Sequence, residues 1–336
     1  MKAVIIGSGL QARRRGQAIL DSNGDFLVGI YSDNQETASS LSNFFRCQNF
    51  SSATKLLEVE GVDTVVICTP PDSHFAYIKM ALEAKKHVLV EKPFTQNSEQ
   101  SNALLDLAKN SDSTLRCGFN HRFHPAILDL KKKIDLGELG AIKFSRSLYG
   151  IGLRDEYQHE WRANPKVAAG GQFMEQGSHL VDLMQFLIGN VRSIFLKPMN
   201  FILPSVSGED SGLALLTHNN GAISNVTSTL LQWHNRFSIE IFGESGFAII
   251  EGLGGSYGVE TLKVGMNLPG QPFRSETVEF RSGDQSWAKE WDSFKSACKG
   301  DLSVSATPEE AHQVMKIVEA GYKSAETKTE VWCQTP

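Results

Sequence analysis

Lys92 is a candidate proton donor or acceptor, because its neighbours predict a fixed place at the edge of a sheet. It stands in the run Glu91-Lys92-Pro93, directly after the apolar residues 87–90. Such a run predicts a buried strand, and ligands bind at the carboxyl ends of strands in doubly wound sheets. Pro93 restricts the backbone beside the lysine and can form a cis bond, so it would hold the lysine in one direction. An ordinary surface lysine is the alternative.

Glu175 and His179 form a second candidate group. They are four residues apart within residues 170–188, which predict one long helix, so both side chains would lie on the same helix face. Asp182 follows three residues later, close to that face. A face with an acid, an imidazole and a second acid is unusual in a core and favours a functional site. A solvated polar stripe or a helix-capping histidine is the alternative.

A glycine-rich turn lies between the apolar residues 4–6 and a helix-like segment at residues 11–22. Its sequence, Gly7-Ser8-Gly9-Leu10-Gln11-Ala12, has the GxGxxA pattern of dinucleotide-binding turns. The first glycine permits the tight turn, the second lets a pyrophosphate approach the backbone, and the small Ala12 lets the helix pack closely. A turn that binds nothing is the alternative. We expect the cofactor contacts here to come from Gly7, Gly9, Leu10 and Gln11.

The end of the second predicted strand, residues 26–31, bears on the choice of dinucleotide. An acid there hydrogen-bonds a ribose 2′-hydroxyl and repels a 2′-phosphate. Ser32 stands where the acid is expected and Asp33 follows it, so the sequence favours NAD over NADP without deciding between them. Arg13, Arg14 and Arg15 could help to neutralise a diphosphate, or could form an exposed basic patch.

The remaining elements predict an α/β fold. Apolar runs alternate with helix-like segments in the first third of the chain, which predicts a parallel sheet covered by helices. Residues 194–250 contain several strand candidates separated by turn signals, which favours antiparallel pairing. Thr307 and Pro308 open a last helix as N-cap and first helical residue. We expect a Rossmann doubly wound parallel sheet in a domain at residues 1–119, and an α+β domain with a mostly antiparallel open sheet at residues 120–336.

Composition excludes several classes of protein. The 336 residues include 33 Lys+Arg and 38 Asp+Glu, which gives a formal charge of −5 and no excess for binding nucleic acid. No apolar run reaches the ~18 residues of a membrane span, and the N-terminal apolar stretch is too short for a signal peptide. Five cysteines without a CxxC pair fit reduced thiols. We expect a cytoplasmic protein with neither membrane nor nucleic-acid partners.

Three motifs together resemble the glucose–fructose oxidoreductase/inositol dehydrogenase/rhizopine catabolism family (Gfo/Idh/MocA). They are the GxGxxA turn, the run Cys68-Thr69-Pro70-Pro71-Asp72-Ser73-His74, and Glu91-Lys92-Pro93. Residues 118–125 are similar to the family's entry into its second domain, and residues 170–182 to its catalytic helix. The resemblance extends over essentially the whole chain. It implies NAD(P)-dependent oxidation or reduction of a sugar, nucleotide sugar or polyol, in a subunit that commonly dimerises or tetramerises through its open sheet.

The resemblance also implies site residues. Catalytic residues would be Lys92, His179 and Glu175, although the family often has aspartate at the position of Glu175. Further cofactor contacts would come from Ser32, Asp33, Thr69, Pro70, His74, Glu91, Lys92, Trp161 and Arg162. Substrate contacts would come from Lys92, Asn120, Arg122, Gln172, Glu175 and His179.

Removal of a hydride from a carbinol carbon requires a base at the hydroxyl. Lys92 and His179 can share that task, and either can be the immediate proton acceptor. His121 and His124 form an HxxH pair, but no third ligand has suitable spacing, so we assign no metal. Two alternatives stay open: a noncatalytic NAD(P)-binding regulator, and an enzyme that uses NAD in a net redox-neutral reaction. An open sheet with one uncovered face predicts a homodimer or homotetramer.

Overall fold

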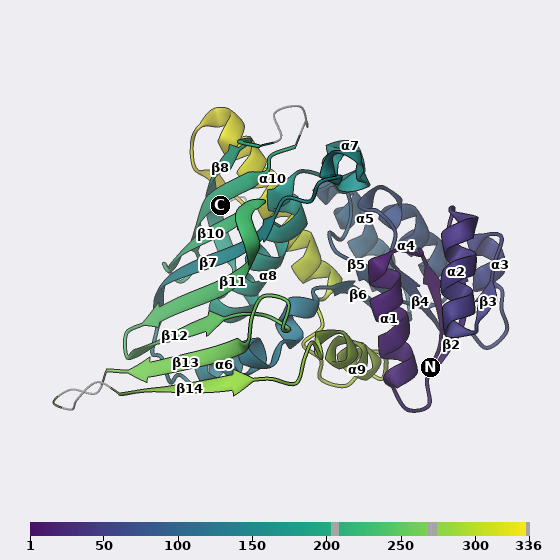
Figure 1. The fold of residues 1–336 in the computed structure, drawn as a ribbon, viewed down its shortest axis with the longest axis horizontal. Coiled ribbons are helices and arrows are strands. Elements are labelled where there is room, and N and C mark those ends of the chain that lie inside the picture. The colour runs from purple at the N-terminus through teal and green to yellow at the C-terminus, as the bar shows by residue number, and fades with distance from the viewer. Residues whose placement is uncertain (203–207, 268–269, 271–273, 334–336) are drawn as a thin grey trace. The chain divides into compact units, whose positions relative to one another are not determined.

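The computed structural model describes residues 1–202, 208–267, 270 and 274–333. The chain forms two compact units (Figure 1). Met1–Asn120 and Trp287–Met315 make up the first unit, and His121–Ser286 and Lys316–Pro336 make up the second. The first unit therefore contains a C-terminal segment that the sequence prediction assigned to the second domain.

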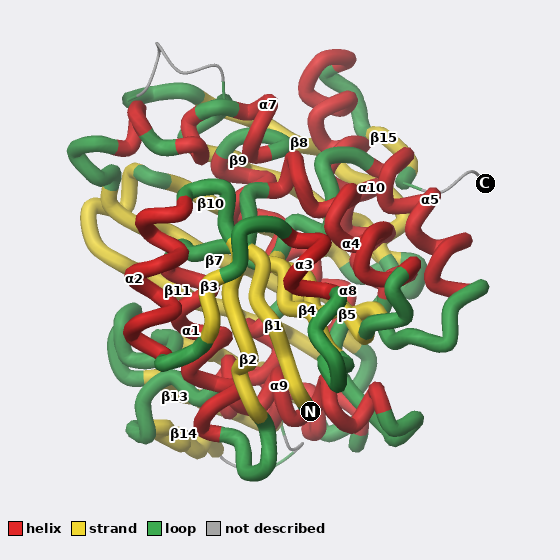
Figure 2. Tube along the Cα trace, turned by 90° about the vertical axis from the view of Figure 1, so that its right-hand side faces the viewer, coloured by secondary structure: helices red, strands yellow, loops and turns green. Residues whose placement is uncertain are grey.

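The first unit contains a six-stranded parallel sheet in the order β3-β2-β1-β4-β5-β6. This order is that of a doubly wound dinucleotide-binding fold, so the predicted fold class is confirmed. Figure 2 shows β2, β1 and β4 side by side, with α1 and α2 to one side of them and α4 and α5 to the other. The strands are β1 (Lys2–Ile6), β2 (Phe26–Tyr31), β3 (Gln48–Asn49), β4 (Thr64–Ile67), β5 (His87–Glu91) and β6 (Leu115–Gly118). The helices are α1 (Leu10–Asp21), α2 (Gln35–Phe45), α3 (Ala53–Leu57), α4 (His74–Glu83) and α5 (Ser98–Lys109).

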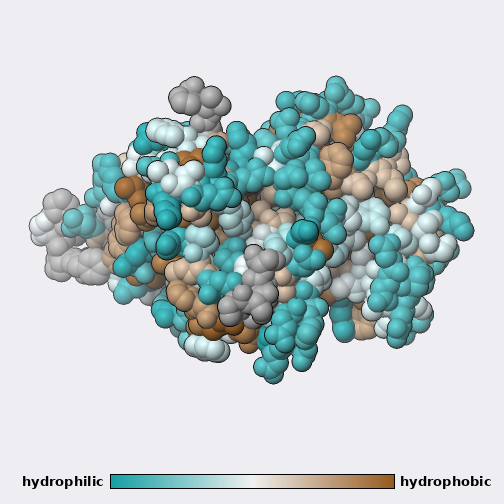
Figure 3. All heavy atoms as spheres, turned by 90° about the horizontal axis from the view of Figure 1, so that it is seen from above, coloured by the Kyte–Doolittle hydropathy of each residue, from teal (hydrophilic) through white to brown (hydrophobic). Residues whose placement is uncertain are grey.

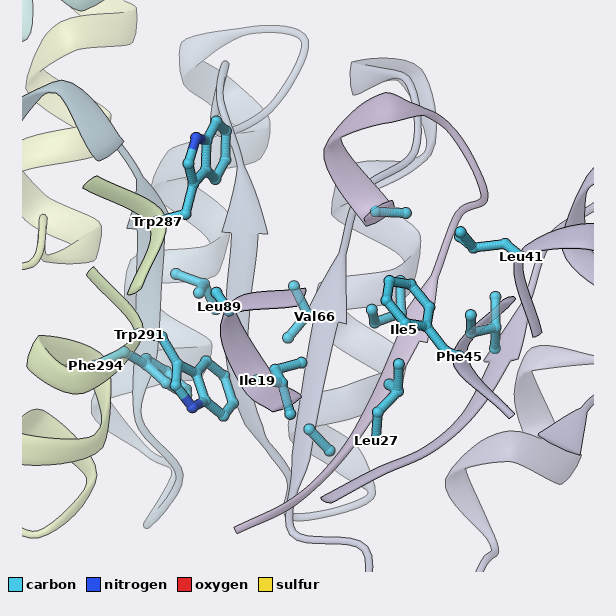
Figure 4. Packing of buried hydrophobic residues seen from close by; sticks show 14 residues of the cluster. Ile5, Ile19, Leu27, Leu41, Phe45, Val66, Leu89, Trp287, Trp291 and Phe294 are labelled. Carbon is cyan, nitrogen blue, oxygen red and sulfur yellow. The ribbon is translucent and has the colours of Figure 1, made fainter. Parts of the chain in front are cut away.

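Helix α9 (Ser286–Cys298) supplies aromatic side chains to the core of the first unit. Trp291 and Phe294 are buried against α1 and the sheet, in the same cluster as Ile19 and Leu89 (Figure 4). The sequence prediction did not include α9. Because this helix completes the hydrophobic layer over α1, the first unit is built from both ends of the chain.

The second unit contains a nine-stranded sheet in the order β14-β13-β12-β11-β7-β10-β9-β8-β15. Strands β7 and β10 pair in parallel and the other neighbours are antiparallel, so the sheet is mostly antiparallel, as the sequence predicted. The strands are β7 (Ile142–Gly152), β8 (Val191–Met199), β9 (Ser211–His218), β10 (Ile223–Thr229), β11 (Leu231–Gly243), β12 (Gly246–Glu251), β13 (Glu260–Met266), β14 (Arg274–Phe280) and β15 (Val331–Trp332). Helix α6 (Pro125–Asp135) precedes this sheet in the chain, and the short α7 (Pro165–Ala168) follows β7.

The predicted long helix at residues 170–188 is divided in two. Phe173–Gly177 form a π-helical turn, and α8 (Ser178–Ile188) continues from it. A Cβ on Gly177 would lie 2.7 Å from the ring of Phe173, so the wide turn closes over an aromatic ring that leaves room only for glycine. Single π-turns within helices occur often at functional sites.

Helix α10 (Pro308–Thr327) begins as predicted. The backbone N–H of Glu310 donates to the Thr307 hydroxyl at 3.2 Å, and the backbone N–H of Thr307 donates to the Glu310 carboxylate at 2.9 Å. This reciprocal pair is a capping box.

Surface hydrophobicity is dispersed on the face seen in Figure 3, where brown areas are interspersed with teal hydrophilic ones. Within the described part of the chain, no helix is both long and apolar enough to cross a bilayer.

Candidate active site

The glycine-rich turn has the geometry that a dinucleotide requires. Gly7 has a φ of +116°, and a Cβ there would lie 2.6 Å from the carbonyl oxygen of Cys68. Gly9 is the N-cap of α1 without a side-chain cap, and a Cβ there would meet no atom within 4 Å. The first turn of α1 contains no acid. This end of α1 therefore offers uncapped N–H groups and open space, and both suit a pyrophosphate. Leu10 is exposed and Gln11 is partly buried at the same end.

The end of β2 presents an exposed carboxylate. The Tyr31 hydroxyl donates to the Asp33 carboxylate at 2.5 Å, and this hydrogen bond raises the pKa of Tyr31. Asp33 is exposed and Ser32 is partly buried. The tyrosine thus orients a negative charge at the place where the sequence predicted contact with a ribose.

The three arginines of α1 do not share one environment. The guanidinium of Arg13 lies 4.3 Å from the ring centre of Phe44, and that of Arg14 lies 5.4 Å from that of Trp287. Arg15 is only 2% exposed and forms ion pairs with Glu91 and Glu290. Arg15 is therefore not part of an exposed basic patch, and its charge is already balanced by buried acids.

Lys92 lies one residue beyond β5 and is partly buried. The peptide bond between Lys92 and Pro93 is cis. His74, fully buried, has Nδ1 2.9 Å from the Pro93 carbonyl oxygen and Nε2 2.9 Å from the Thr69 carbonyl oxygen. Burial lowers the pKa of His74, and the two carbonyl groups oppose that shift. The sequence predicted that His74 contacts the cofactor, whereas in the structure its side chain joins the loop after β4 to the loop after β5.

The loop after β4 holds two further predicted cofactor residues, Thr69 and Pro70. The Ser73 hydroxyl donates to the Thr69 hydroxyl at 2.7 Å, which orders the start of α4. Both Thr69 and Pro70 are partly buried at the carboxyl edge of the sheet. Their position suits a cofactor that extends along this edge.

In the second unit, the π-turn and α8 present Glu175 and His179. Arg162 donates from Nε to Glu175 at 3.2 Å, and its guanidinium lies 4.3 Å from the ring centre of Trp161. His179 is 5% exposed, and its ring centre lies 3.8 Å from that of His121. Within the second unit, Arg162 thus contacts both Glu175 and Trp161, and His179 contacts His121.

Gln172, Asn120 and Arg122 are all buried, although the sequence predicted that they contact substrate. The Gln172 side chain donates to Gln176. Arg122 donates from Nε and Nη2 to the Asp182 carboxylate at 2.8 and 2.6 Å. Asp182 therefore forms an ion pair with Arg122, and this pair connects the start of the second unit to α8.

His124 does not pair with His121 as a ligand set. Its Nδ1 lies 3.0 Å from the Glu260 carboxylate, which also accepts the backbone N–H of Ala126 at 2.7 Å. Among the residues that the structure describes, no three His, Cys, Asp or Glu side chains are grouped so that they could hold a metal ion.

Glu209 and Tyr322 are site-supporting residues to which the sequence analysis gave no role. The Tyr322 hydroxyl donates to the Glu209 carboxylate at 2.8 Å, and that carboxylate accepts the backbone N–H of Phe173 at 2.9 Å. The backbone N–H of Gly171 donates to the Tyr322 hydroxyl at 3.3 Å. Burial raises the pKa of Glu209 and of Tyr322. The signal in the sequence was Gly170-Gly171, because a side chain at Gly171 would collide with Glu209.

Comparison with known proteins identifies the class. Residues 1–119 match the oxidoreductase family with an NAD-binding Rossmann fold, and residues 127–249 match the GFO/IDH/MocA C-terminal domain. The chain therefore belongs to the Gfo/Idh/MocA family, as its motifs suggested. It is an NAD(P)-dependent oxidoreductase, and its first unit binds the dinucleotide.

Individual relatives are dehydrogenases of sugars. The chain is 27% identical over 291 residues to UDP-N-acetylglucosamine 3-dehydrogenase of Acidithiobacillus ferrooxidans, and the match spans 84% of each chain. A levoglucosan dehydrogenase in complex with NADH has a TM-score of 0.91 at 22% identity, with all of both chains covered. The WlbA dehydrogenase from Bordetella pertussis, in complex with NADH and UDP-GlcNAcA, has a TM-score of 0.84 at 22% identity and covers 100% of this chain and 99% of its own. The two structural similarities establish the fold.

Proposed function

We propose that this oxidoreductase transfers a hydride between a nicotinamide and a hydroxyl-bearing carbon of a sugar, a nucleotide sugar or a polyol. The observation that carries the proposal is the position of Lys92, a partly buried residue at the carboxyl edge of the dinucleotide-binding sheet. The loop that follows it is held by the contact between Pro93 and His74. The relative from Acidithiobacillus ferrooxidans, which acts on a nucleotide sugar, supports this substrate class.

The bound cofactor supplies the hydride acceptor or donor, and the chain's own residues handle the proton. We assign to Lys92 the removal of the hydroxyl proton, or its return in the reverse direction. His179 hydrogen-bonds the same oxygen and can exchange the roles of donor and acceptor with Lys92. Glu175, held by Arg162, accepts hydrogen bonds from substrate hydroxyls.

Arg122 has a different proposed role from the predicted one. Its guanidinium is engaged by Asp182 and is 2% exposed, so we propose that it positions α8 and does not touch substrate. Gln172 and Asn120 stay predicted substrate contacts.

NAD is the proposed physiological cofactor. The exposed Asp33 carboxylate, oriented by Tyr31, would accept hydrogen bonds from a ribose 2′-hydroxyl and repel a 2′-phosphate. Two of the arginines of α1 have other contacts, since Arg13 lies over the ring of Phe44 and Arg15 is buried with its two acids.

Assembly and location complete the proposal. Apolar side chains are exposed on one face of the second sheet, where Leu215 pairs with Phe195 and Ile223 pairs with Phe144. We propose a homodimer or homotetramer that buries this face. The five free thiols support a cytoplasmic location.

The deciding experiment is an assay of NAD(P)H absorbance with a panel of free sugars, UDP-sugars and polyols. Net formation of NADH with one of these substrates is the expected result. Dinucleotide binding without any turnover across the panel would favour a noncatalytic regulator. Substrate conversion without net NADH would favour a redox-neutral enzyme.

A further inference from the structure

Arg15 lies in a buried cluster of charges beneath the end of β5. Its Nε donates to the Glu91 carboxylate at 2.7 Å, and its Nη1 pairs with Glu290 of α9. The three side chains are 2%, 6% and 0% exposed. Burial alone would lower the pKa of Arg15, but the charges of Glu290 and Glu91 outweigh burial and raise it. The guanidinium is therefore charged, and its Nε and Nη1 are bonded to the two acids.

Stability alone does not explain why three charged side chains are buried together here. Burying ionised groups is costly even when they pair, and apolar residues of similar volume are often at least as stable in the same place. The first unit already has an aromatic and aliphatic core around α1 and α9. Charge at this point gives a fixed hydrogen-bond geometry that apolar packing would not give.

The group that Arg15 holds in this geometry is Glu91, the residue directly before Lys92. On β5, Leu89 packs into the core beside α9 (Figure 4), and Glu91, two residues later, points to the same side. Lys92 follows at a bend directly after the strand and stands before proline, so its side chain takes its direction from the backbone that Glu91 anchors. The direction of Lys92 thus depends on how firmly the carboxylate of Glu91 is held.

The other side of Lys92 is held as well. The carbonyl oxygen of Pro93 lies 2.9 Å from Nδ1 of His74. The backbone around Lys92 is therefore restrained before the lysine through the side chain of Glu91, and after it through the carbonyl group of Pro93.

The neighbouring strand leaves room for this arrangement. Gly118, the last residue of β6, pairs with Glu91 across the sheet. A Cβ on Gly118 would lie against the Arg15 guanidinium and 3.2 Å from the carbonyl oxygen of Val90. Glycine at this position is what allows Arg15 to reach the end of β5.

We propose that Arg15 is a positioning residue for Lys92: through the buried carboxylate of Glu91 it fixes the direction in which the lysine amine meets the substrate. Because Arg15 stands on α1, whose N-terminus faces the dinucleotide, one helix orients both the cofactor and the proton-transfer group. The inference rests on the proposed catalytic role of Lys92.

The test is a double-mutant cycle between Arg15 and Lys92. Arg15→Lys keeps the charge but replaces the planar five-donor group with a single ammonium, which cannot reproduce the contacts with both acids. We expect kcat to fall by about ten- to hundredfold, the scale of a misplaced catalytic group, while the KM for the dinucleotide changes less than about twofold. In the Lys92→Met background, Arg15→Lys should cause no further loss of kcat. Equal losses in both backgrounds would overturn the proposal.

Two further variants keep the test decisive if Arg15→Lys folds poorly. Glu91→Gln weakens the contact that orients Lys92, whereas Glu290→Gln, its isosteric counterpart, leaves the contact between Arg15 and Glu91 in place. We expect Glu91→Gln to reduce kcat more than Glu290→Gln, again only when Lys92 is present. Equal effects of the two variants would mean that the cluster only stabilises the fold.

The controls separate this inference from the proposed function. Gln17→Ala, at an exposed position of α1 whose side chain donates to Asp21, should leave kcat unchanged. Turnover that persists in Lys92→Met would reject the proposed catalytic role itself, and with it the inference. Loss of turnover in Lys92→Met with full turnover in Arg15→Lys would reject the inference alone.

Discussion

The rings of His121 and His179 lie against each other in the second unit, with their centres 3.8 Å apart and their planes inclined by 33°. His121 also contacts Tyr149 edge-on, with ring centres 5.1 Å apart. His179 is therefore fixed by its own helix and by two aromatic rings, those of His121 in the turn before α6 and of Tyr149 in β7. A ring held in this way keeps one orientation, which is what a group that hydrogen-bonds a substrate oxygen requires.

Gly9→Val is expected to abolish dinucleotide binding without loss of the fold. A Cβ at Gly9 would meet no protein atom within 4 Å, so the added side chain starts in open space at the N-terminus of α1, where the pyrophosphate is expected. Titration of the variant with NAD by intrinsic fluorescence measures the loss. Unchanged affinity would contradict the assignment of this turn.

Gly7→Ala is the matched control for the fold. Its Cβ would lie 2.6 Å from the Cys68 carbonyl oxygen, at a φ of +116°. We expect this change to lower the unfolding free energy by about 1–3 kcal/mol, the cost of a strained backbone position. The two variants should thus differ in urea unfolding, where Gly7→Ala is less stable than the wild type and Gly9→Val is not.

Particular residues show how much of the fold and of the site could be predicted from the sequence. The GxGxxA turn, the end of β5 and the capping box of α10 were predictable because each depends on local backbone rules. Arg15 was not, because its partner Glu290 is 275 residues away and lies in a helix that was not predicted. The signal for α9 was present in the spacing of Trp287, Trp291 and Phe294, which share one helix face.

The second unit shows the same limit. Gly170-Gly171 and Glu175 were visible in the sequence, but a regular helix was the natural prediction because nothing local distinguishes a π-turn from an α-turn. Arg122 was predicted to contact substrate. Its bidentate pairing with Asp182 depends on tertiary packing, which decides whether a polar residue faces a ligand or another side chain.

Asp33→Asn is expected to shift cofactor preference from NAD toward NADP. The amide can still accept the hydrogen bond from Tyr31, but it no longer repels a 2′-phosphate. We expect the ratio of kcat/KM for NAD to that for NADP to fall by about tenfold, equivalent to about 1.4 kcal/mol. The measurement is steady-state kinetics with both cofactors. A wild-type enzyme that prefers NADP would show that Asp33 does not select the cofactor.

Leu215→Glu is expected to disrupt the assembly. Leu215 is 49% exposed and lies opposite Phe195 in the register of β8 and β9, so a charge there would be buried in any interface formed by this face. Light scattering should give a dimer or tetramer for the wild type and a smaller species for the variant. Leu136→Glu, at a 67% exposed position at the end of α6, is the control and should not change the mass. A monomeric wild type at micromolar concentration would reject the proposed interface.

Stability should decrease in acid partly through Glu260. Burial would raise the pKa of this carboxyl, but its contacts with His124, Ala126 and Gly254 outweigh burial and lower it below the usual value. The contribution of Glu260 to stability is therefore complete above the pKa of the unfolded chain, and is lost as the pH falls through the folded pKa. Urea unfolding at pH 7 and below pH 4.5 should show a smaller acid-induced loss in Glu260→Gln than in the wild type. Glu58→Gln, at an exposed helix end, should behave like the wild type.

Lys92→Met and His179→Ala test the proton chemistry directly. If both groups serve one substrate oxygen, each change should reduce kcat by about a hundredfold or more, the scale of a lost general acid or base. The double variant should lose less than the product of the two single losses, because groups that act as a unit are not additive. Dinucleotide affinity, measured in parallel by fluorescence, should survive in all three variants. Losses that multiply would mean that the two residues act in separate steps, and near-normal turnover in Lys92→Met would remove the lysine from the mechanism.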